Sequence, residues 1–183
     1  MTDNRPATPV HSPTKKQRVF KSLKSVCAYA VFIVLITHAV DFYRLSERQS
    51  LQVSPELLPQ LIKQLPAAQR QAFEQGQPML VFVWASWCGV CRATSRAVSH
   101  IAADYPVASI AMQSGDKAQV TAYLQQHNYV FPALADEHGQ WAKSLQASAT
   151  PSFFIVSSSG QIEYYSVGIN TEPSLRAKLL LYH

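Results

Sequence analysis

The sequence is poor in cysteine, and this scarcity argues against a metal site. Only three of its 183 residues are cysteines, and the single C-x-x-C pair is Cys88 and Cys91. Structural zinc sites take four ligands, commonly from two such pairs or from histidines at matching spacing. No second pair exists, and the nearby histidines are scattered without ligand spacing (His100, His127 and His138). We therefore expect neither a metal nor a bound cofactor at the motif.

An excess of basic charge is absent from most of the chain. The net charge of +5 comes from residues 1–24, which hold six basic residues and one acidic residue, whereas the rest of the chain holds ten of each. A nucleic-acid-binding domain needs a basic face, so we expect no nucleic-acid partner. Residues 1–24 are rich in Pro, Thr and Ser without an apolar pattern, which predicts a disordered tail.

Charged residues are also missing from residues 25–40, a run of 16 residues that only His38 interrupts. As a helix this run covers about 24 Å, less than the roughly 30 Å of a bilayer core, but apolar neighbours lengthen it to residues 25–45. By the positive-inside rule the basic tail before it stays in the cytoplasm. We expect a single transmembrane anchor in a bacterial inner membrane, a linker over residues 46–53 and a periplasmic domain over residues 54–183.

A cleaved signal peptide and a buried core helix are the alternatives to an anchor. The long basic region before the apolar run favours the anchor, and Thr37-His38-Ala39 is a poor cleavage site. Cys27 lies at the start of the run, where we expect an inert, apolar thiol. A lipid-modified cysteine would lie at the end of the run instead.

The C-x-x-C pair lies between an apolar run and a helical pattern. Residues 79–84 are continuously apolar and rich in Val and Phe, which is typical of a strand buried on both faces. Apolar residues then recur at helical spacing after Cys91. Cys88 therefore falls at a helix N-terminus, where unpaired N–H groups and the helix dipole favour a thiolate. We expect Cys88 to be the nucleophile and Cys91 the resolving thiol.

The sequence Trp-Cys-x-x-Cys after an apolar strand resembles the thioredoxin superfamily. A second match is Ala-Thr-Pro-Ser at residues 149–152, which resembles the Thr-Pro segment of that superfamily. The resemblance implies that Pro151 is cis and faces the C-x-x-C, and that the backbone at Thr150 pairs with an extended substrate peptide. Trp87 is expected to border the active-site surface and to contact substrate.

The segment before Thr150 narrows this resemblance. Phe-Pro-x-Leu-x-Asp from Phe131, a glycine three residues later and a predicted short helix are similar to the TlpA/CcmG-type branch of membrane-tethered thioredoxins. Residues 25–183 resemble the ScsD-like proteins associated with suppression of copper sensitivity, which share the anchor and the Trp-Cys-Gly-Val-Cys-Arg motif. The resemblance implies substrate proteins with disulfides or thiols, and a membrane electron donor of the DsbD/ScsB type.

Two positions depart from the thioredoxin pattern. Phe82 stands where cytosolic thioredoxins place a buried aspartate that helps to deprotonate the resolving cysteine. Another carboxylate, a water or the substrate has to take that role here. Val90 replaces the usual proline between the cysteines, and such changes move the reduction potential within about −270 to −120 mV. Neither Gly89 nor Val90 is the histidine of the strongly oxidising pattern, which favours a reductase.

The other patterns predict the elements around the motif. Helices are expected at residues 57–65, 67–75, 116–127, 141–145 and 171–181, and strands at residues 107–112, 153–156 and 162–167. This order predicts an α/β, thioredoxin-like fold with a central mixed sheet and helices on both faces.

These expectations combine into a membrane-tethered thiol-disulfide oxidoreductase that acts on extracytoplasmic proteins as a reductase. Copper or redox stress tolerance and cytochrome c maturation are the settings that the resemblance implies. Two alternatives stay open: a disulfide-inserting oxidase, and a metal-handling or scaffold protein with a thioredoxin shell.

Overall fold

The computed structural model describes residues 52–182. Their helices are α2 (Leu57–Gln64), α3 (Ala67–Glu74), α4 (Gly89–Ile101), α5 (Lys117–Gln126), α6 (Gln140–Ser144) and α7 (Glu172–Leu181). Their strands are β1 (Met79–Trp84), β2 (Val107–Met112), β3 (Leu134–Asp136), β4 (Ser152–Val156) and β5 (Ile162–Val167). The predicted tail, the predicted anchor and most of the predicted linker lie outside the described residues. Among residues 52–182, none of the helices has the length and apolar character that crossing a membrane requires.

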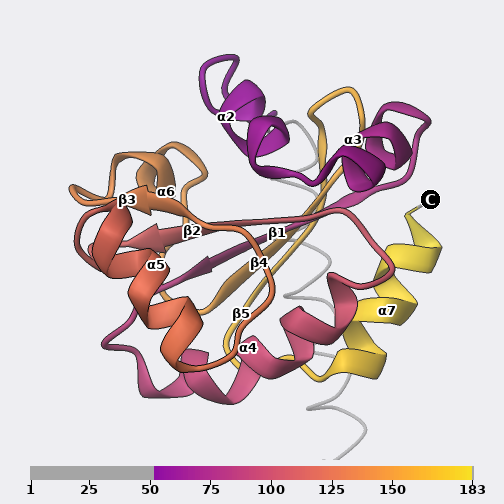
Figure 1. Cartoon of the computed structure of the whole chain (residues 1–183). Coiled ribbons are helices and arrows are strands. Elements are labelled where there is room, and N and C mark those ends of the chain that lie inside the picture. Colours follow the sequence, from indigo (N-terminus) through magenta and orange to yellow (C-terminus); the bar gives the residue numbers. More distant parts are fainter. Residues whose placement is uncertain (1–51, 183) are drawn as a thin grey trace, which may run out of the picture. The chain divides into compact units, whose positions relative to one another are not determined.

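The strands form one mixed sheet in the order β3-β2-β1-β4-β5 (Figure 1). The neighbours β1 and β2 are parallel, as are β2 and β3, whereas β4 runs antiparallel to both β1 and β5. The central strand β1 is buried along its whole length, in agreement with its continuous run of apolar residues. The predicted α/β fold with a mixed sheet is confirmed.

Alternate residues of β1 face two apolar clusters, as the period of two in a strand requires. Leu80, Phe82 and Trp84 pack in a cluster with α4, α5 and α7, and this cluster contains both cysteines of the motif. Met79, Val81 and Val83 pack in the other cluster, with α2, α3 and α6. Helices therefore cover both faces of the sheet, and the redox pair lies in the cluster on the face covered by α4, α5 and α7.

The predicted boundaries hold where the sequence has a strong local signal. Pro66 separates α2 from α3, because proline lacks the N–H that a helix interior needs. Asp116 caps α5: its carboxylate accepts from the backbone N–H of Gln119, whose side chain accepts from the backbone N–H of Asp116. Thr171 lies at the N-cap of α7 without a side-chain capping bond.

The short strand β3 was not expected from the sequence. It pairs with β2 over only three residues, and two of them are partly exposed. A segment this short carries too little periodicity to be recognised as a strand. Val53, the last residue of the predicted linker, is buried, and its N–H donates to the carbonyl of Gly160.

Candidate active site

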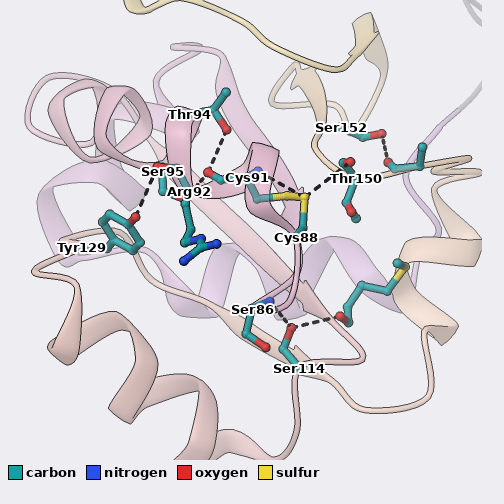
Figure 2. The surroundings of a disulfide bond; sticks show 12 residues. Ser86, Cys88, Cys91, Arg92, Thr94, Ser95, Ser114, Tyr129, Thr150 and Ser152 are labelled. Carbon is teal, nitrogen blue, oxygen red and sulfur yellow. Dashed lines mark hydrogen bonds between the residues drawn. A yellow bond between two sulfur atoms is a disulfide. The ribbon is translucent and has the colours of Figure 1, made fainter.

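The two cysteines of the motif occupy the start of α4 and are joined by a disulfide (Figure 2). β1 ends at Trp84, and a short turn brings Cys88 to the N-cap position with an extended backbone. The Sγ atom of Cys88 accepts from the backbone N–H of Cys91 at 3.1 Å. A helix N-terminus presents such N–H groups without an intrahelical partner. This N–H therefore favours negative charge on the sulfur of Cys88 once the disulfide is reduced.

The two sulfurs differ in how a partner can approach them. Cys88 retains 8% of its accessible surface, while Cys91 retains 1%. Thiol-disulfide exchange requires the attacking sulfur to meet the partner's sulfur directly. Cys88 is the more exposed of the two, which is the asymmetry expected of an attacking and a resolving cysteine.

The Thr150–Pro151 segment lies against Cys88, although the two are 62 residues apart in sequence. The peptide bond between Thr150 and Pro151 is cis. The carbonyl oxygen of Thr150 is 3.7 Å from the Sγ of Cys88, a contact that becomes a hydrogen bond only when the reduced thiol has a proton to donate. The hydroxyl of Ser152 donates to Ala149, and the N–H of Gly168 donates to Pro151. These bonds fix the segment beside the disulfide.

Trp87 forms an exposed part of the rim, with 62% of its surface accessible. Its indole N–H donates to the carbonyl of Gln113 at 3.0 Å. One residue earlier, the N–H of Ser86 donates to the hydroxyl of Ser114 at 2.9 Å (Figure 2). Gln113 has a φ of 47°, in the left-handed region. The loop after β2 therefore holds the motif and its exposed aromatic ring in place.

Gln113 and Ser114 were not identified from the sequence, although a signal exists. Parallel neighbouring strands end at the same edge of a sheet, and functional loops gather there. β1 is followed by the motif, and its parallel neighbour β2 is followed by residues 113 and 114. The pairing of these two strands would have brought the two loops together.

Phe82 is fully buried beneath the redox pair. Its ring stacks on Phe153 at a centroid distance of 5.1 Å and meets the edge of Phe131 at 5.7 Å. Among residues 52–182, the one buried carboxylate is that of Asp136, which accepts from the N–H of Ala142 in α6. Ala142 packs in the cluster on the other face of the sheet. Asp136 therefore does not replace the missing aspartate beside Cys91.

Two buried hydroxyls follow Cys91 in α4. Those of Thr94 and Ser95 both donate to the backbone carbonyl of Cys91, at 3.0 Å and 2.8 Å. Both hydroxyls are therefore engaged with the helix backbone. The Sγ of Cys91 thus lies among apolar side chains, where a thiolate is poorly solvated.

Two of the three histidines considered as metal ligands have other contacts. His100 lies 2.9 Å from a carboxylate oxygen of Glu172, and the ring of His127 stacks on Tyr123 with centroids 4.2 Å apart. In the part of the chain that the structure describes, no three His, Cys, Asp or Glu side chains gather into a metal-binding group.

The chain is similar to known proteins in sequence and in fold. A family model described as Redoxin matches residues 56–179. The chain is 29% identical to a thioredoxin-like protein of Haemophilus influenzae, over 88% of this chain and 95% of that protein. It is 34% identical to a thiol:disulfide interchange protein DsbE homolog of Paracoccus denitrificans, over 49% of this chain and 50% of that protein. The lipoprotein thioredoxin Etrx1 of Streptococcus pneumoniae superposes with a TM-score of 0.54 at 18% identity, covering 61% of this chain and 88% of Etrx1.

The family match covers most of the described residues and includes the motif, both flanking strands and the Thr150–Pro151 segment. It agrees with the resemblance to the thioredoxin superfamily and its TlpA/CcmG-type branch, whereas the narrower likeness to ScsD-like proteins stays a prediction. The chain belongs to the Redoxin family and is a thioredoxin-like disulfide oxidoreductase whose redox pair is Cys88 and Cys91.

Proposed function

We propose that the protein is a membrane-tethered reductase of disulfides in extracytoplasmic proteins. The observation that carries this proposal is the asymmetric redox pair beside an available backbone. Cys88 is the sulfur that remains accessible, it accepts an N–H from the start of α4, and the Thr150 carbonyl lies 3.7 Å from it. An extended partner peptide that pairs with the backbone at Thr150 brings its own disulfide to Cys88.

The reaction begins with the reduced pair. The Cys88 thiolate attacks one sulfur of the substrate disulfide, so that a mixed disulfide forms and the second substrate sulfur leaves as a thiolate. Cys91 then attacks the sulfur of Cys88 and releases the first substrate sulfur. Two electrons have passed to the substrate, and the Cys88–Cys91 disulfide is the oxidised product.

The second step requires Cys91 to lose its proton in an apolar environment. Phe82 occupies the place of the usual aspartate, and the buried carboxylate of Asp136 accepts a hydrogen bond from the backbone of α6. The substrate sulfur that leaves Cys88 needs a proton at this moment. We assign the role of proton acceptor to the departing substrate thiolate, which takes up the proton that Cys91 loses.

A membrane electron donor of the DsbD/ScsB type closes the cycle by reducing the Cys88–Cys91 disulfide with a dithiol of its own. The tether is the predicted anchor over residues 25–45, which lies outside the described residues. The support for it is the uncharged apolar run that follows a basic tail. Copper or redox stress tolerance is the physiological setting that we propose, with cytochrome c maturation as the alternative.

The direction of electron flow is tested by the redox state of the pair in living cells, with acid quenching and thiol alkylation. A Cys27→Ser background removes the third cysteine, so that the label reports only Cys88 and Cys91. We expect a largely reduced pair. A pair that is mostly oxidised, and stays so when the membrane donor is overproduced, would identify an oxidase instead.

Tethering is tested separately by fractionation. The full chain should stay in the membrane pellet after alkaline carbonate washing, and a reporter fused after His183 should be active only outside the cytoplasm. Release by carbonate, or reporter activity inside the cell, would overturn the anchor. Metal bound at the pair without turnover of any disulfide would favour the metal-handling alternative.

A further inference from the structure

Arg92 follows the buried cysteine directly and is an exposed cation. In the described part of the chain, no carboxylate lies within 4.0 Å of its guanidinium, which makes no hydrogen bond there either. Arg176 on α7 shows the contrast: its guanidinium donates to Glu172 and to Asp104, each at 2.8 Å. The fork of donors on Arg92 is therefore available to an incoming group.

The guanidinium of Arg92 lies beside Gly89, between the two cysteines in sequence. A Cβ atom placed on Gly89, the residue after Cys88, would be 3.9 Å from the Nη2 atom of Arg92. The side chain thus extends back along the first turn of α4. Figure 2 shows Arg92 between Tyr129 and Cys88 in this view. Tyr129 secures this turn from the other side, because its hydroxyl donates to the carbonyl of Arg92 at 3.3 Å.

Within residues 52–182, the segments around the disulfide hold no negative charge to neutralise Arg92. α4 contains no acidic residue, and the segments that contact the motif contain none either (112–115, 128–132 and 148–151). Residues 167–170, which bond to Pro151, also lack an acidic residue. Asp116, just beyond the first of these segments, already accepts from the N–H of Gln119 at 2.8 Å. Arg96, one turn after Arg92, is a second exposed cation. Like charges at this spacing repel each other, so the surface favours an anion from outside.

We propose that Arg92 is a specificity-determining residue that binds a carboxylate next to the reacting cysteine of the partner protein. This inference rests on the proposed disulfide exchange and names the class of substrate: segments with Asp or Glu beside the cysteine. The planar guanidinium matches a carboxylate with two parallel hydrogen bonds, which lysine cannot form. Arg96 adds long-range attraction without contacting the reacting group.

The test uses the reduced full chain in nonionic detergent and two synthetic disulfide peptides that differ only in Glu or Gln beside the cysteine. At low salt we expect the second-order rate constant for the Glu peptide to exceed that for the Gln peptide by about two- to fivefold. The preference should shrink in about 0.5 M salt, where exposed charges are screened. Arg92→Gln should abolish it, Arg92→Glu should reverse it, and Arg92→Lys should retain part of it.

The matched control is Lys143→Gln, which removes an exposed cation from α6, on the other face of the sheet. It should leave the preference unchanged. The pH profile of Cys88 alkylation by iodoacetamide separates docking from an effect on the thiolate. If Arg92→Gln slows both peptides equally and moves that profile, Arg92 acts on Cys88 and the docking role is overturned. If the unmodified chain reduces both peptides at equal rates, the docking role of Arg92 is overturned but the proposed disulfide exchange is not. If it reduces neither peptide, the proposed function itself is overturned.

Discussion

The two ends of α4 handle charge in opposite ways. At its C-terminal end, His100 and Asp104 lie in a network with Glu172 and Arg176 of α7, in which both carboxylates pair with Arg176. At its N-terminal end, Arg92 is unpaired beside the disulfide, and the cysteines lie on apolar side chains. Paired charges hold two helices together, whereas the free charge and accessible sulfur are available to another molecule. The comparison separates residues that build the fold from residues that meet a substrate.

The largest effect is expected from the cysteines at the N-terminal end. Cys88→Ala should abolish disulfide exchange, because it removes the accessible nucleophile. Cys91→Ala should instead trap partner proteins as mixed disulfides through Cys88, which non-reducing gels can display. The double variant is the control and should trap nothing. Trapping by Cys88→Ala, through Cys91, would contradict the assignment of the two roles.

The second-largest effect is expected from Phe82, which lies in the apolar cluster that contains the redox pair. Phe82→Asp should lower the free energy of unfolding by about 3–5 kcal/mol, because it removes a fully buried aromatic ring and buries a carboxyl group. The carboxylate should nevertheless speed the attack of Cys91, since it supplies the missing proton acceptor. Urea denaturation measures the first quantity, and decay of a preformed mixed disulfide measures the second. Phe82→Ala has a similar cavity without the acid. Equal decay in the two variants would show that proton removal is not limiting.

A smaller effect is expected at the exposed rim. Trp87→Ala should slow reduction of a protein disulfide by about tenfold, since exposed aromatic rings are common anchors of protein contacts. A small disulfide such as Ellman's reagent should react at a nearly unchanged rate. Leu180→Ala on α7 removes another exposed apolar side chain and is the control. Parallel losses with both substrates would indicate that Trp87 supports the motif rather than the partner.

The smallest effect should come from the paired end of α4. Hydrogen bonds from Arg176 and then His100 lower the pKa of Glu172. The carboxylate therefore stabilises the fold above its unfolded pKa, and this contribution is lost as the pH falls through the folded pKa. Glu172→Gln should lower the melting temperature slightly at about pH 7, and this difference should shrink as the pH falls through the lowered pKa of Glu172. Its rate of disulfide exchange should match that of the unmodified chain. A slower exchange would show that the ion pairs at the C-terminal end of α4 also affect the redox pair at its N-terminal end.

Most of the local structure was predictable because its signals lie close together in the sequence. The apolar run of β1, the helical pattern after Cys91 and the cap at Asp116 each lie within a single strand or helix. The three residues of β3 escaped prediction because their pairing with β2 depends on the sheet and not on their own pattern. The roles of Gln113 and Ser114 escaped for the same reason.

The sequence by itself determined the redox pair and its place at a helix N-terminus, since both follow from adjacent residues. The resemblance to thioredoxins added that Phe82 stands in place of an aspartate. Only the tertiary structure decided which distant groups meet there. The antiparallel pairing of β1 with β4 brings Thr150 to Cys88, and the parallel pairing of β1 with β2 brings Gln113 to Trp87. Strand order fixes these encounters because the ends of paired strands must lie side by side, wherever their residues fall in the chain.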